Sequence, residues 1–482
     1  MLETQDLTFS YDGSMQILQS LHLQLHRGEL LLITGPTGSG KSTLAKCLAG
    51  FIPRSIEGFF SGSVQIDGKN TENLSIADFS KRVSLVQQDP DSQICTLRVS
   101  DEVAFGPENF EFDEKTVEHL VKSSLSDVNS LHLSQRTTHT LSGGEKQRIA
   151  IAAMLSCQSD FLILDEPSSS LDPRGIIQLR NILYKLKTKN VGIICIEHNL
   201  DAVRPIADRT LSLDNGIFSN TPERTSQDFV IPSELHTLTG QEPLLSLEGV
   251  NFSYGSTPTI KTVDLSISSG EIIALMGGNG SGKTTLLFLL GGLLAPKNGR
   301  VSLSGVSLSE LKPKDITRQL SMVFQNPNHQ IFESTVWKEQ ILTSEILEMT
   351  DEEHKKFSRH LLETAGLLHL SERNPFSLSH GQKRRLNITS TTGHKPQILL
   401  LDEPFIGQDR DGRQFILKTI YSIVKNGGTA LIVTHDVHFA KKYCTRILFI
   451  ENGSLLLDGN PETVLQRLSE LGHDEYTIGV ET

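Results

Sequence analysis

A long internal repeat constrains the fold of this chain more than any other feature. Residues 30–44 read LLLITGPTGSGKSTL and residues 272–286 read IIALMGGNGSGKTTL, which places Lys41 opposite Lys283. Further matches follow in the same order: FSY at 9–11 and 252–254, QDP at 88–90 with QNP at 325–327, LSGGEKQR at 141–148 with LSHGQKRR at 378–385, LILDEP at 162–167 with LLLDEP at 399–404, and EH at 197–198 with TH at 434–435. The chain is therefore a tandem duplication of one domain type.

The repeat and the length together predict the domain boundaries. The chain has 482 residues, and domains usually contain roughly 100–200 residues. We expect one domain at 1–219 and a second at 244–482. The segment between them, 220–243, reads NTPERTSQDFVIPSELHTLTGQEP; it is polar, contains three prolines and has no clear periodicity. This segment is predicted to be a linker.

The composition excludes several classes of protein. The 45 Lys and Arg against 57 Asp and Glu give a formal net charge of −12, so the chain lacks the basic character of a dedicated nucleic-acid-binding protein. The first residues, MLETQDLTFSYDG, show no basic or apolar stretch of a signal peptide. The longest apolar run, near 286–295, is shorter than the roughly 20 residues that span a bilayer. A membrane role is therefore expected to depend on a partner.

The cysteines indicate a reducing compartment. They are odd in number, widely scattered and include no C-x-x-C pair, so a disulfide framework is not expected. We expect all five to be small core residues: Cys47, Cys95, Cys157, Cys195 and Cys444.

The order of apolar patterns in each half indicates an α/β domain. The first half begins with alternating apolar positions such as Leu21, Leu23 and Leu25, and both halves continue with an apolar run, a glycine-rich loop and a helical pattern. Alternation predicts a half-buried strand, whereas a continuous apolar run is typical of a strand buried on both faces. We therefore expect two α/β domains, each with a strand-rich N-terminal portion and a parallel core sheet.

Each glycine-rich loop fits the phosphate-binding pattern G-x-x-x-x-G-K-[ST]. Small residues let successive backbone N–H groups surround a phosphate chain, the lysine reaches the outer phosphates, and the following hydroxyl coordinates Mg²⁺. The helix that follows each loop adds its favourable dipole. The candidate residues are Gly35, Pro36, Thr37, Gly38, Ser39, Gly40, Lys41, Ser42 and Thr43 in the first half, and Gly277, Gly278, Asn279, Gly280, Ser281, Gly282, Lys283, Thr284 and Thr285 in the second.

Two acidic residues end an apolar strand in each half. The runs LILDE and LLLDE place Asp165 with Glu166, and Asp402 with Glu403, at the carboxyl ends of strands, where α/β sheets carry their chemistry. The aspartate can hold the Mg²⁺ shell, and the glutamate can polarise the water that attacks a γ-phosphate. Taken alone, such a strand end is more often a solvated turn. The matched glycine-rich loops favour a catalytic site.

Residues 141–145 (LSGGE) and 378–382 (LSHGQ) resemble the signature motif of ATP-binding-cassette ATPases. The resemblance covers nearly the whole chain outside the linker and the C-terminal end. It implies tandem P-loop domains, each with an antiparallel β subdomain and a helical signature subdomain, and it implies ATP and Mg²⁺ as cofactors. In this family each ATP lies between the glycine-rich loop of one domain and the signature of the other. The signature residues implied to bind ATP are Ser142, Gly144, Ser379 and Gly381.

Four further pairs of residues match family positions around the nucleotide. They are the aromatic that stacks on adenine, the glutamine that contacts Mg²⁺, the aspartate of the loop after the catalytic glutamate, and the histidine that binds the γ-phosphate. In this order the pairs are Tyr11 and Tyr254, Gln88 and Gln325, Asp172 and Asp409, and His198 and His435. The implied catalytic residues are Glu166, Glu403, His198 and His435. The implied metal ligands are Ser42, Thr284, Gln88, Gln325, Asp165 and Asp402.

The two halves differ inside these motifs. His380 stands where the family has its first signature glycine, and Gln408 replaces the usual leucine before Asp409. A side chain at a position of close backbone approach can crowd a phosphate. We therefore expect two ATP sites, of which the one that combines Lys41 and Glu166 with the second signature is the slower.

The segment after Gln88 indicates one kind of transporter. It reads DPDSQICTLRVSDEVAFGPEN at 89–109 and resembles the ATPases of energy-coupling-factor importers, including tandem ATPases assigned to a thiamine-precursor importer; the segment after Gln325 lacks AFGPEN. The resemblance implies an importer of a vitamin or metal ion, with the ATPase on the cytoplasmic side of the cell membrane. The implied partners are an integral membrane coupling subunit and a membrane substrate-binding subunit, which would hold the specificity.

Other tandem ATPases stay open as alternatives. An ATPase of a sugar-type importer or of an exporter would share the cassettes, although the DSQI and AFGPEN run argues against it. A soluble ATPase acting on ribosomes would usually join its halves by a long charged helix, in contrast to the short, proline-bearing segment 220–243. The neighbouring genes and the proteins that co-purify distinguish these possibilities.

Overall fold

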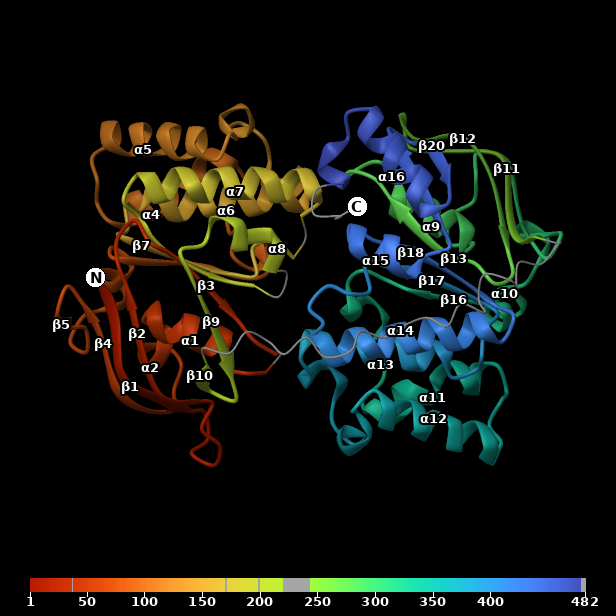
Figure 1. The fold of residues 1–482 in the computed structure, drawn as a ribbon, viewed down its shortest axis with the longest axis horizontal. Coiled ribbons are helices and arrows are strands. Elements are labelled where there is room, and N and C mark those ends of the chain that lie inside the picture. Colours follow the sequence, from red (N-terminus) through yellow and green to blue (C-terminus); the bar gives the residue numbers. More distant parts are fainter. Residues whose placement is uncertain (37, 170, 198–199, 220–242, 478–482) are drawn as a thin grey trace. The chain divides into compact units, whose positions relative to one another are not determined.

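The computed structural model describes residues 1–36, 38–169, 171–197, 200–219 and 243–477. The chain divides into two compact units, Met1–Ser226 and Gln227–Thr482 (Figure 1). Each unit is described by itself below. The expected linker lies outside the described residues except for Pro243, which begins the first strand of the second unit.

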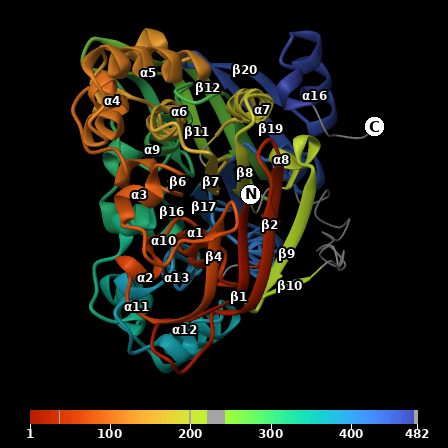
Figure 2. The same ribbon diagram turned by 90° about the vertical axis from the view of Figure 1, so that its left-hand side faces the viewer.

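An antiparallel sheet of four strands forms the N-terminal part of each unit. Its order is β2-β1-β4-β5 in the first unit and β12-β11-β14-β15 in the second, and Figure 2 shows β1, β2 and β4 side by side. The alternation predicted at Leu21, Leu23 and Leu25 is confirmed, because all three are buried. The strands are β1 (Leu2–Ser10), β2 (Leu18–Leu25), β4 (Phe59–Ile66), β5 (Lys69–Asn70), β11 (Pro243–Tyr254), β12 (Thr257–Ser268), β14 (Asn298–Leu303) and β15 (Val306–Ser307).

A six-stranded, mainly parallel sheet forms the core of each unit. The order β10-β9-β3-β8-β7-β6 in the first unit corresponds strand for strand to β20-β19-β13-β18-β17-β16 in the second. Only the edge strands β10 and β20 run antiparallel to their neighbours. The strands are β3 (Leu30–Thr34), β6 (Val83–Val86), β7 (Phe161–Asp165), β8 (Gly192–Ile196), β9 (Arg209–Asp214), β10 (Ile217–Ser219), β13 (Ile272–Met276), β16 (Leu320–Val323), β17 (Ile398–Asp402), β18 (Thr429–Val433), β19 (Arg446–Glu451) and β20 (Ser454–Gly459).

Both faces of each core sheet are buried, as expected for parallel strands. In β3, Leu31 and Ile33 join a cluster with the antiparallel sheet, whereas Leu30 and Leu32 join a separate cluster on the other face. The second unit shows the same division into two clusters. The continuous apolar runs of the sequence are therefore strands that serve two cores at once.

Helices cover the sheets, and one group of three stands together in each unit. In Figure 1 this helical subdomain comprises α4, α5 and α6 in the first unit and α11, α12 and α13 in the second. The first unit contains α1 (Lys41–Leu48), α2 (Phe51–Arg54), α3 (Ile76–Ser80), α4 (Val99–Asn109), α5 (Glu114–Asp127), α6 (Gly143–Ser156), α7 (Pro173–Thr188) and α8 (Leu200–Val203). The second contains α9 (Lys283–Leu290), α10 (Pro313–Gln319), α11 (Val336–Ile346), α12 (Glu352–Thr364), α13 (His380–Thr392), α14 (Arg410–Lys425), α15 (Val437–Tyr443) and α16 (Pro461–Glu470).

The corresponding helices α6 and α13 differ in what they bury. The buried part of α6 is mainly alanine and isoleucine, whereas α13 buries Arg384, Asn387, Thr389, Ser390 and Thr392. Partners on neighbouring segments accept or donate hydrogen bonds: the Asn387 amide donates to the carbonyl of Pro327 at 2.9 Å, and the Gln340 amide donates to the carbonyl of Thr389 at 3.0 Å. The second helical subdomain therefore has a polar core.

One expectation about the cysteines is wrong. Cys47, Cys157, Cys195 and Cys444 are buried, but Cys95 is exposed. It lies in the loop before α4, where its backbone N–H donates to a carboxylate oxygen of Glu102 at 3.0 Å, so the loop is held by its backbone and the thiol stays at the surface. None of the helices in the described part of the chain has the length and apolar character needed to span a bilayer.

Candidate nucleotide sites

The first glycine-rich loop forms a tight turn between β3 and α1. Gly35 has φ +146°, and a Cβ there would lie 2.0 Å from the carbonyl oxygen of Leu213, so only glycine fits. The Lys41 ammonium donates to the carbonyls of Gly35 and Pro36, both at 2.8 Å. The side chain therefore crosses the concave face of the loop. Thr37, predicted to belong to the loop, lies outside the described residues.

The second loop repeats this geometry between β13 and α9. Gly277 has φ +147°, and a Cβ there would lie 2.2 Å from the carbonyl oxygen of Ile450. The Lys283 ammonium donates to the carbonyls of Gly277 and Gly278, both at 2.9 Å. The remaining glycines and small residues predicted for the two loops lie between strand and helix as expected: Gly38, Ser39, Gly40, Asn279, Gly280, Ser281 and Gly282.

The donors around both loops fit a phosphate chain. The hydroxyls of Ser39 and Ser281 are buried and have no hydrogen-bond partner among the described residues, which is costly unless a ligand supplies one. Thr43 and Thr285, in the first turns of α1 and α9, are also buried. Unused donors, a lysine held over the loop and a helix N-terminus together form an anion site.

In the first unit the acidic strand end approaches the helix after the loop. Asp165 is the last residue of β7 and is buried, and burial raises the pKa of its carboxyl while a hydrogen bond with Ser42 opposes that shift. Glu166 follows with φ +51°, and its backbone N–H donates to the carbonyl of Ile196 at 2.9 Å. This backbone conformation turns the glutamate away from the strand direction. The hydroxyl and carboxylate are a suitable pair for Mg²⁺.

The second unit has the same arrangement. The Thr284 hydroxyl donates to Asp402 Oδ2 at 3.0 Å, and burial raises the pKa of Asp402. Glu403 has φ +47° and is 9% exposed. Burial raises the pKa of Glu403 to about 8. The His435 Nε2 lies 3.3 Å from Glu403 Oε1, so the two predicted catalytic residues of this unit are neighbours.

The two glutamines predicted to contact the metal lie differently in the two units. The Gln88 amide donates to Glu166 Oε2 at 2.7 Å, so the structure brings this pair together. The Gln325 side chain is exposed, and its backbone carbonyl accepts from Arg384. His198, the predicted partner of Glu166, lies outside the described residues.

Both signature motifs begin helices. Ser142 caps α6 by accepting from the backbone N–H of Glu145, and Ser379 caps α13 by accepting from that of Gln382; each completes a capping box. Gly144 and Gly381 lie buried in the first turns. The N–H groups of these turns point outward along the helix axis, where they can bind an anion.

The sequence differences in the second signature have a structural counterpart. A Cβ on Gly407 would lie 3.1 Å from His380 Nδ1, so the imidazole packs against the loop after Glu403. The buried Gln408 amide donates to the carbonyl of Gly381 at 3.2 Å. In the first unit Leu171, at the position of Gln408, makes an apolar contact near Gly144 instead.

The remaining predicted residues lie beside the loops or cap helices. The rings of Tyr11 and Tyr254 are about half exposed and pack edge-on against Phe9 and Phe252, which leaves ring surface for a base. The Tyr11 hydroxyl is 3.2 Å from the Thr43 hydroxyl. The aspartates Asp172 and Asp409 cap α7 and α14 by accepting from the N–H groups of Gly175 and Gly412.

Two residues near these sites were missed at the sequence level. Arg384 is fully buried beside Asp402, and Glu197 is 2% exposed and accepts from the backbone N–H of Ser168 at 2.9 Å. Aligning the two halves would have singled out both positions, because the counterparts Gln147 and Thr434 differ in charge. Arg384 stands within the charged run KRR at 383–385, which by itself does not indicate burial.

Comparison with known proteins decides the family. The sequence profile described as ABC transporter matches residues 18–169 and 260–406. The chain belongs to the ABC transporter family. It is an ATPase that uses ATP with Mg²⁺, and the two glycine-rich loops, the strand-end aspartates and their hydroxyl neighbours fit these ligands.

Full-length relatives of this ABC protein are known. A Bacillus subtilis protein provisionally named as an HMP/thiamine import ATP-binding protein is 32% identical over 96% of this chain and 92% of its own length. A Methanosarcina mazei protein provisionally named as an ABC transporter ATP-binding protein is 33% identical, over 98% of this chain and 91% of its own. A solved structure of ribosome-bound archaeal Pelota and ABCE1 contains a chain similar to 97% of this one, with 81% of that chain covered, TM-score 0.71 and 24% identity. That likeness shows the fold alone.

Proposed function

We propose that this chain is the ATP-hydrolysing subunit of an importer of the energy-coupling-factor type, which takes up a vitamin or a metal ion. The observation that carries the proposal is the Bacillus subtilis relative, whose name refers to HMP/thiamine import and which matches nearly the whole chain. The run at 89–109 supports the same transporter type. The partners are an integral membrane coupling subunit and a membrane substrate-binding subunit, which place the ATPase on the cytoplasmic side of the cell membrane.

The predicted residues have separate roles in ATP hydrolysis. Lys41 and Lys283 bind the outer phosphates, and the backbone N–H groups of the loops surround the remaining oxygens. Ser42, Gln88 and Asp165 in the first unit, and Thr284, Gln325 and Asp402 in the second, would hold Mg²⁺, which would neutralise charge on the phosphates. Glu166 and Glu403 accept a hydrogen bond from the attacking water and orient it. His435, whose Nε2 lies 3.3 Å from Glu403 Oε1, binds the γ-phosphate and maintains the geometry of the water. Most of the catalysis is positioning and electrostatic stabilisation.

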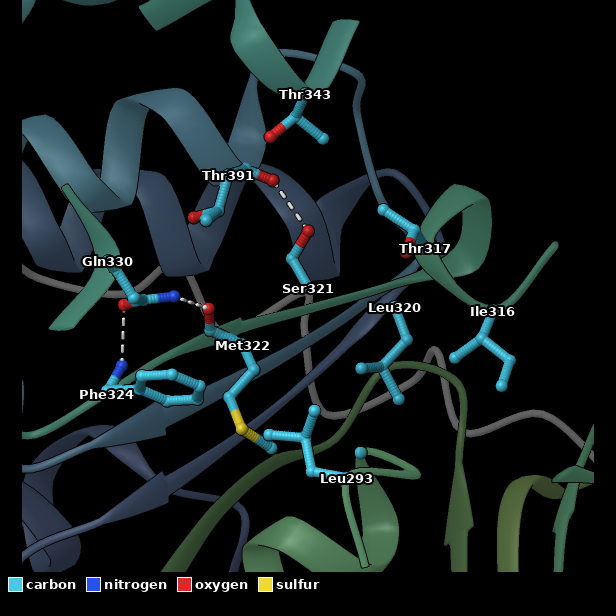
Figure 3. A pocket seen from close by; sticks show the side chains of 11 residues that line it. Leu293, Ile316, Thr317, Leu320, Ser321, Met322, Phe324, Gln330, Thr343 and Thr391 are labelled. Atoms are coloured by element: carbon cyan, nitrogen blue, oxygen red, sulfur yellow. Dashed lines mark hydrogen bonds between the residues drawn. The ribbon is translucent and has the colours of Figure 1, made fainter. Parts of the chain in front are cut away.

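A cavity beside the segment after Gln325 suits a docking helix of a membrane subunit. The cavity of about 190 Å³ lies between β16, α10, α11 and α13, and Figure 3 shows that Leu293, Ile316 and Met322 face it. Its shape is held by Gln330, whose amide donates to the carbonyl of Met322 at 2.8 Å and whose oxygen accepts from the N–H of Phe324 at 2.8 Å. A rigid apolar depression suits an apolar side chain of a partner helix.

Exposed apolar side chains lie along the same segments in both units. Leu97 is 67% exposed and Phe105, on α4, is 51% exposed. In the second unit Phe332 is 74% exposed. Large exposed apolar side chains that follow one segment are typical of an interaction surface. We propose that these residues contact the coupling subunit.

The test is to identify what the protein binds in its native cell. The protein is tagged, the membranes are solubilised gently, and the proteins recovered in stoichiometric amount are identified by mass spectrometry. We expect a coupling-type membrane protein and a small substrate-binding membrane protein. A Leu293→Asp variant, which places a charge at the cavity, is expected to lose both at least tenfold. A partner side chain docked there would bury that charge unpaired, at a cost of several kcal/mol.

A matched control separates docking from folding. Leu471→Asp introduces the same charge at an exposed leucine after α16, outside the cavity, and is expected to keep both membrane partners. Recovery with ribosomes, or recovery of the ATPase alone from membranes of intact cells, would overturn the transport proposal. The ATP chemistry would stand in either case.

A further inference from the structure

The second unit contains a buried arginine that joins two nucleotide-site segments. Arg384, on the second turn of the signature helix α13, has no exposed surface. Its Nη1 donates to the carbonyl of Phe324 at 2.7 Å and to the carbonyl of Asp402 at 3.2 Å, and its Nη2 donates to the carbonyl of Gln325. One guanidinium therefore connects the segment after β16 with the end of β17.

The contacts of Arg384 do not make its buried charge favourable for the stability of the fold. All three hydrogen-bond acceptors are neutral carbonyls, and burying a charge without a directly bonded carboxylate is costly. The carboxylate of Asp402 is close enough to favour the guanidinium, although it accepts no hydrogen bond from it. An apolar side chain at this position would cost less to bury, so the position favours a functional role.

The first unit links the corresponding two segments through other residues. Gln147 stands where the second unit has Arg384, and its amide nitrogen is buried without a hydrogen-bond partner among the described residues. There, the Gln88 side chain bonds Glu166 directly at 2.7 Å. In the second unit, the corresponding Gln325 side chain is exposed. The link between the glutamine segment and the acidic strand end is thus a side-chain bond in one unit and an arginine bridge in the other.

We infer that Arg384 is a positioning residue for ATP hydrolysis in the second unit, where it fixes the backbone of Gln325 relative to that of Asp402. Both residues are the metal ligands assigned in the proposed function, and the inference rests on that assignment. Arg384 lies one turn after Ser379 and Gly381 of the second signature, so its side chain also connects the start of α13 with both segments. The bridge acts on the Mg²⁺-dependent step and leaves the phosphate loop around Lys283 unchanged.

The test replaces Arg384 with the residue of the first unit. In an E166Q background, which leaves Glu403 to drive hydrolysis, R384Q is expected to lower kcat for ATP by about tenfold to a hundredfold, the usual effect of removing a group that orients metal ligands. KM for Mg·ATP should rise only in step with the weaker Mg²⁺-dependent binding described below, because the loop contacts remain. R384K, which keeps the charge and one or two of the hydrogen bonds, should recover a large part of kcat. K383Q removes a charge from an adjacent side chain that contacts Asn328 and should leave kcat within about twofold.

A binding measurement provides a readout besides turnover. In a Lys41→Ala background, ATP binding to the second loop is measured by equilibrium dialysis with Mg²⁺ and with EDTA. R384Q should weaken binding with Mg²⁺ at least fivefold and leave binding in EDTA unchanged. Equal weakening in both conditions, a rise in KM with kcat intact, or no recovery with R384K would overturn the inference. If E403Q itself leaves turnover intact, the proposed site assignment fails instead.

Discussion

His394 is a buried side chain whose chemistry differs from that of its counterpart in the first unit. It lies after α13, is 4% exposed and sits 3.4 Å from the Ser321 hydroxyl. Burial lowers the pKa of His394 to about 4 from its usual 6.5. Cys157, at the corresponding position of the first unit, carries no charge at neutral pH because burial raises the pKa of its thiol to about 11. The second unit alone therefore contains an acid-sensitive group at this place.

Acid should destabilise the second unit through His394. Between pH 6.5 and 4 the unfolded chain binds a proton at this histidine and the folded chain does not, so the stabilisation present above pH 6.5 is lost as pH falls. Relative to His394→Cys, the wild type is expected to lose about 1–2 kcal/mol of unfolding free energy between pH 7 and pH 5. Urea unfolding followed by the fluorescence of Trp337, the single tryptophan, measures this.

The exposed His369 provides the control for this measurement. A His369→Gln variant should retain the full pH dependence of the wild type, because His369 is exposed and the variant leaves His394 unchanged. If His394→Cys keeps the wild-type slope as well, burial of His394 does not control the acid response.

At the residue scale, the sequence predicted which side chains belong to the sites better than it predicted their burial and their partners. Lys41, Asp165 and Glu403 carry recognisable spacing, and the structure places each beside its loop or strand end. Burial depends on partners far away in the chain. The sequence near Arg384 and His394 therefore did not indicate the arginine bridge or the low pKa of His394. Only a comparison of the two halves position by position could have indicated them.

At the scale of elements, the glycine-rich loops depend on two separate physical requirements. Gly35 combines φ +146° with a close approach to the carbonyl of Leu213, whereas Gly38 has φ +83° and nothing within 4 Å of a Cβ. Backbone strain applies to both positions, and steric overlap applies only to the first. A methyl group added at Gly35 therefore displaces the backbone, whereas one added at Gly38 does not.

Alanine substitutions separate these requirements. Gly35→Ala is expected to lower the unfolding free energy by about 2–4 kcal/mol and ATP affinity by more than tenfold, because the loop must shift away from β9. Gly38→Ala should cost about 1–2 kcal/mol. Thermal unfolding and equilibrium ATP binding measure the two effects.

Gly68→Ala serves as the matched control, since Gly68 has φ +72° with open space around it and lies in the turn between β4 and β5. It should lose about 1–2 kcal/mol of stability with unchanged ATP affinity. Equal losses of affinity in Gly35→Ala and Gly68→Ala would contradict the steric argument.

Element boundaries near the motifs were predictable, and helix interiors were not. Capping residues, glycines and terminal acids act locally, so the starts of α6 and α13 at the signatures follow from the sequence. The polar side chains of α13 would be expected on a solvated face. The Asn387 amide is instead buried with a hydrogen bond to the carbonyl of Pro327 on a distant segment. The hydroxyls of Thr389, Ser390 and Thr392 donate to carbonyls of α13 itself.

At the scale of the whole molecule, two units of identical topology carry unlike sites. Both core sheets have the same strand order, and both end β7 or β17 in an aspartate followed by a glutamate at positive φ. The described differences gather at the predicted nucleotide sites: the Gln88 side chain bonds Glu166 in the first unit, and Gln408 bonds the second signature in the other. The duplication was readable from the sequence because motif spacing survives when the side chains between motifs diverge.

The unequal sites predict unequal effects of removing each glutamate. Glu403→Gln is expected to lower steady-state ATP turnover by about a hundredfold or more, the usual range for loss of a general base. Glu166→Gln should lower it by less than about tenfold, because the site it serves is the slower one by our proposal. Phosphate release at saturating Mg·ATP measures both. The reverse order, with turnover intact in Glu403→Gln and abolished in Glu166→Gln, would disprove the proposed asymmetry.

The polar buried face of α13 affects how the two halves of a duplicated gene stay different in sequence. If sequence exchange between the repeats copied α13 over α6, Asn387 and Thr389 would replace Ala150 and Ala152, and Arg384 would replace Gln147, in a core packed with alanine and isoleucine. Larger side chains forced into a well-packed core destabilise a fold by about 1–3 kcal/mol each. Such a recombinant would be removed by selection, so the chemistry of one helix core protects the individuality of each repeat.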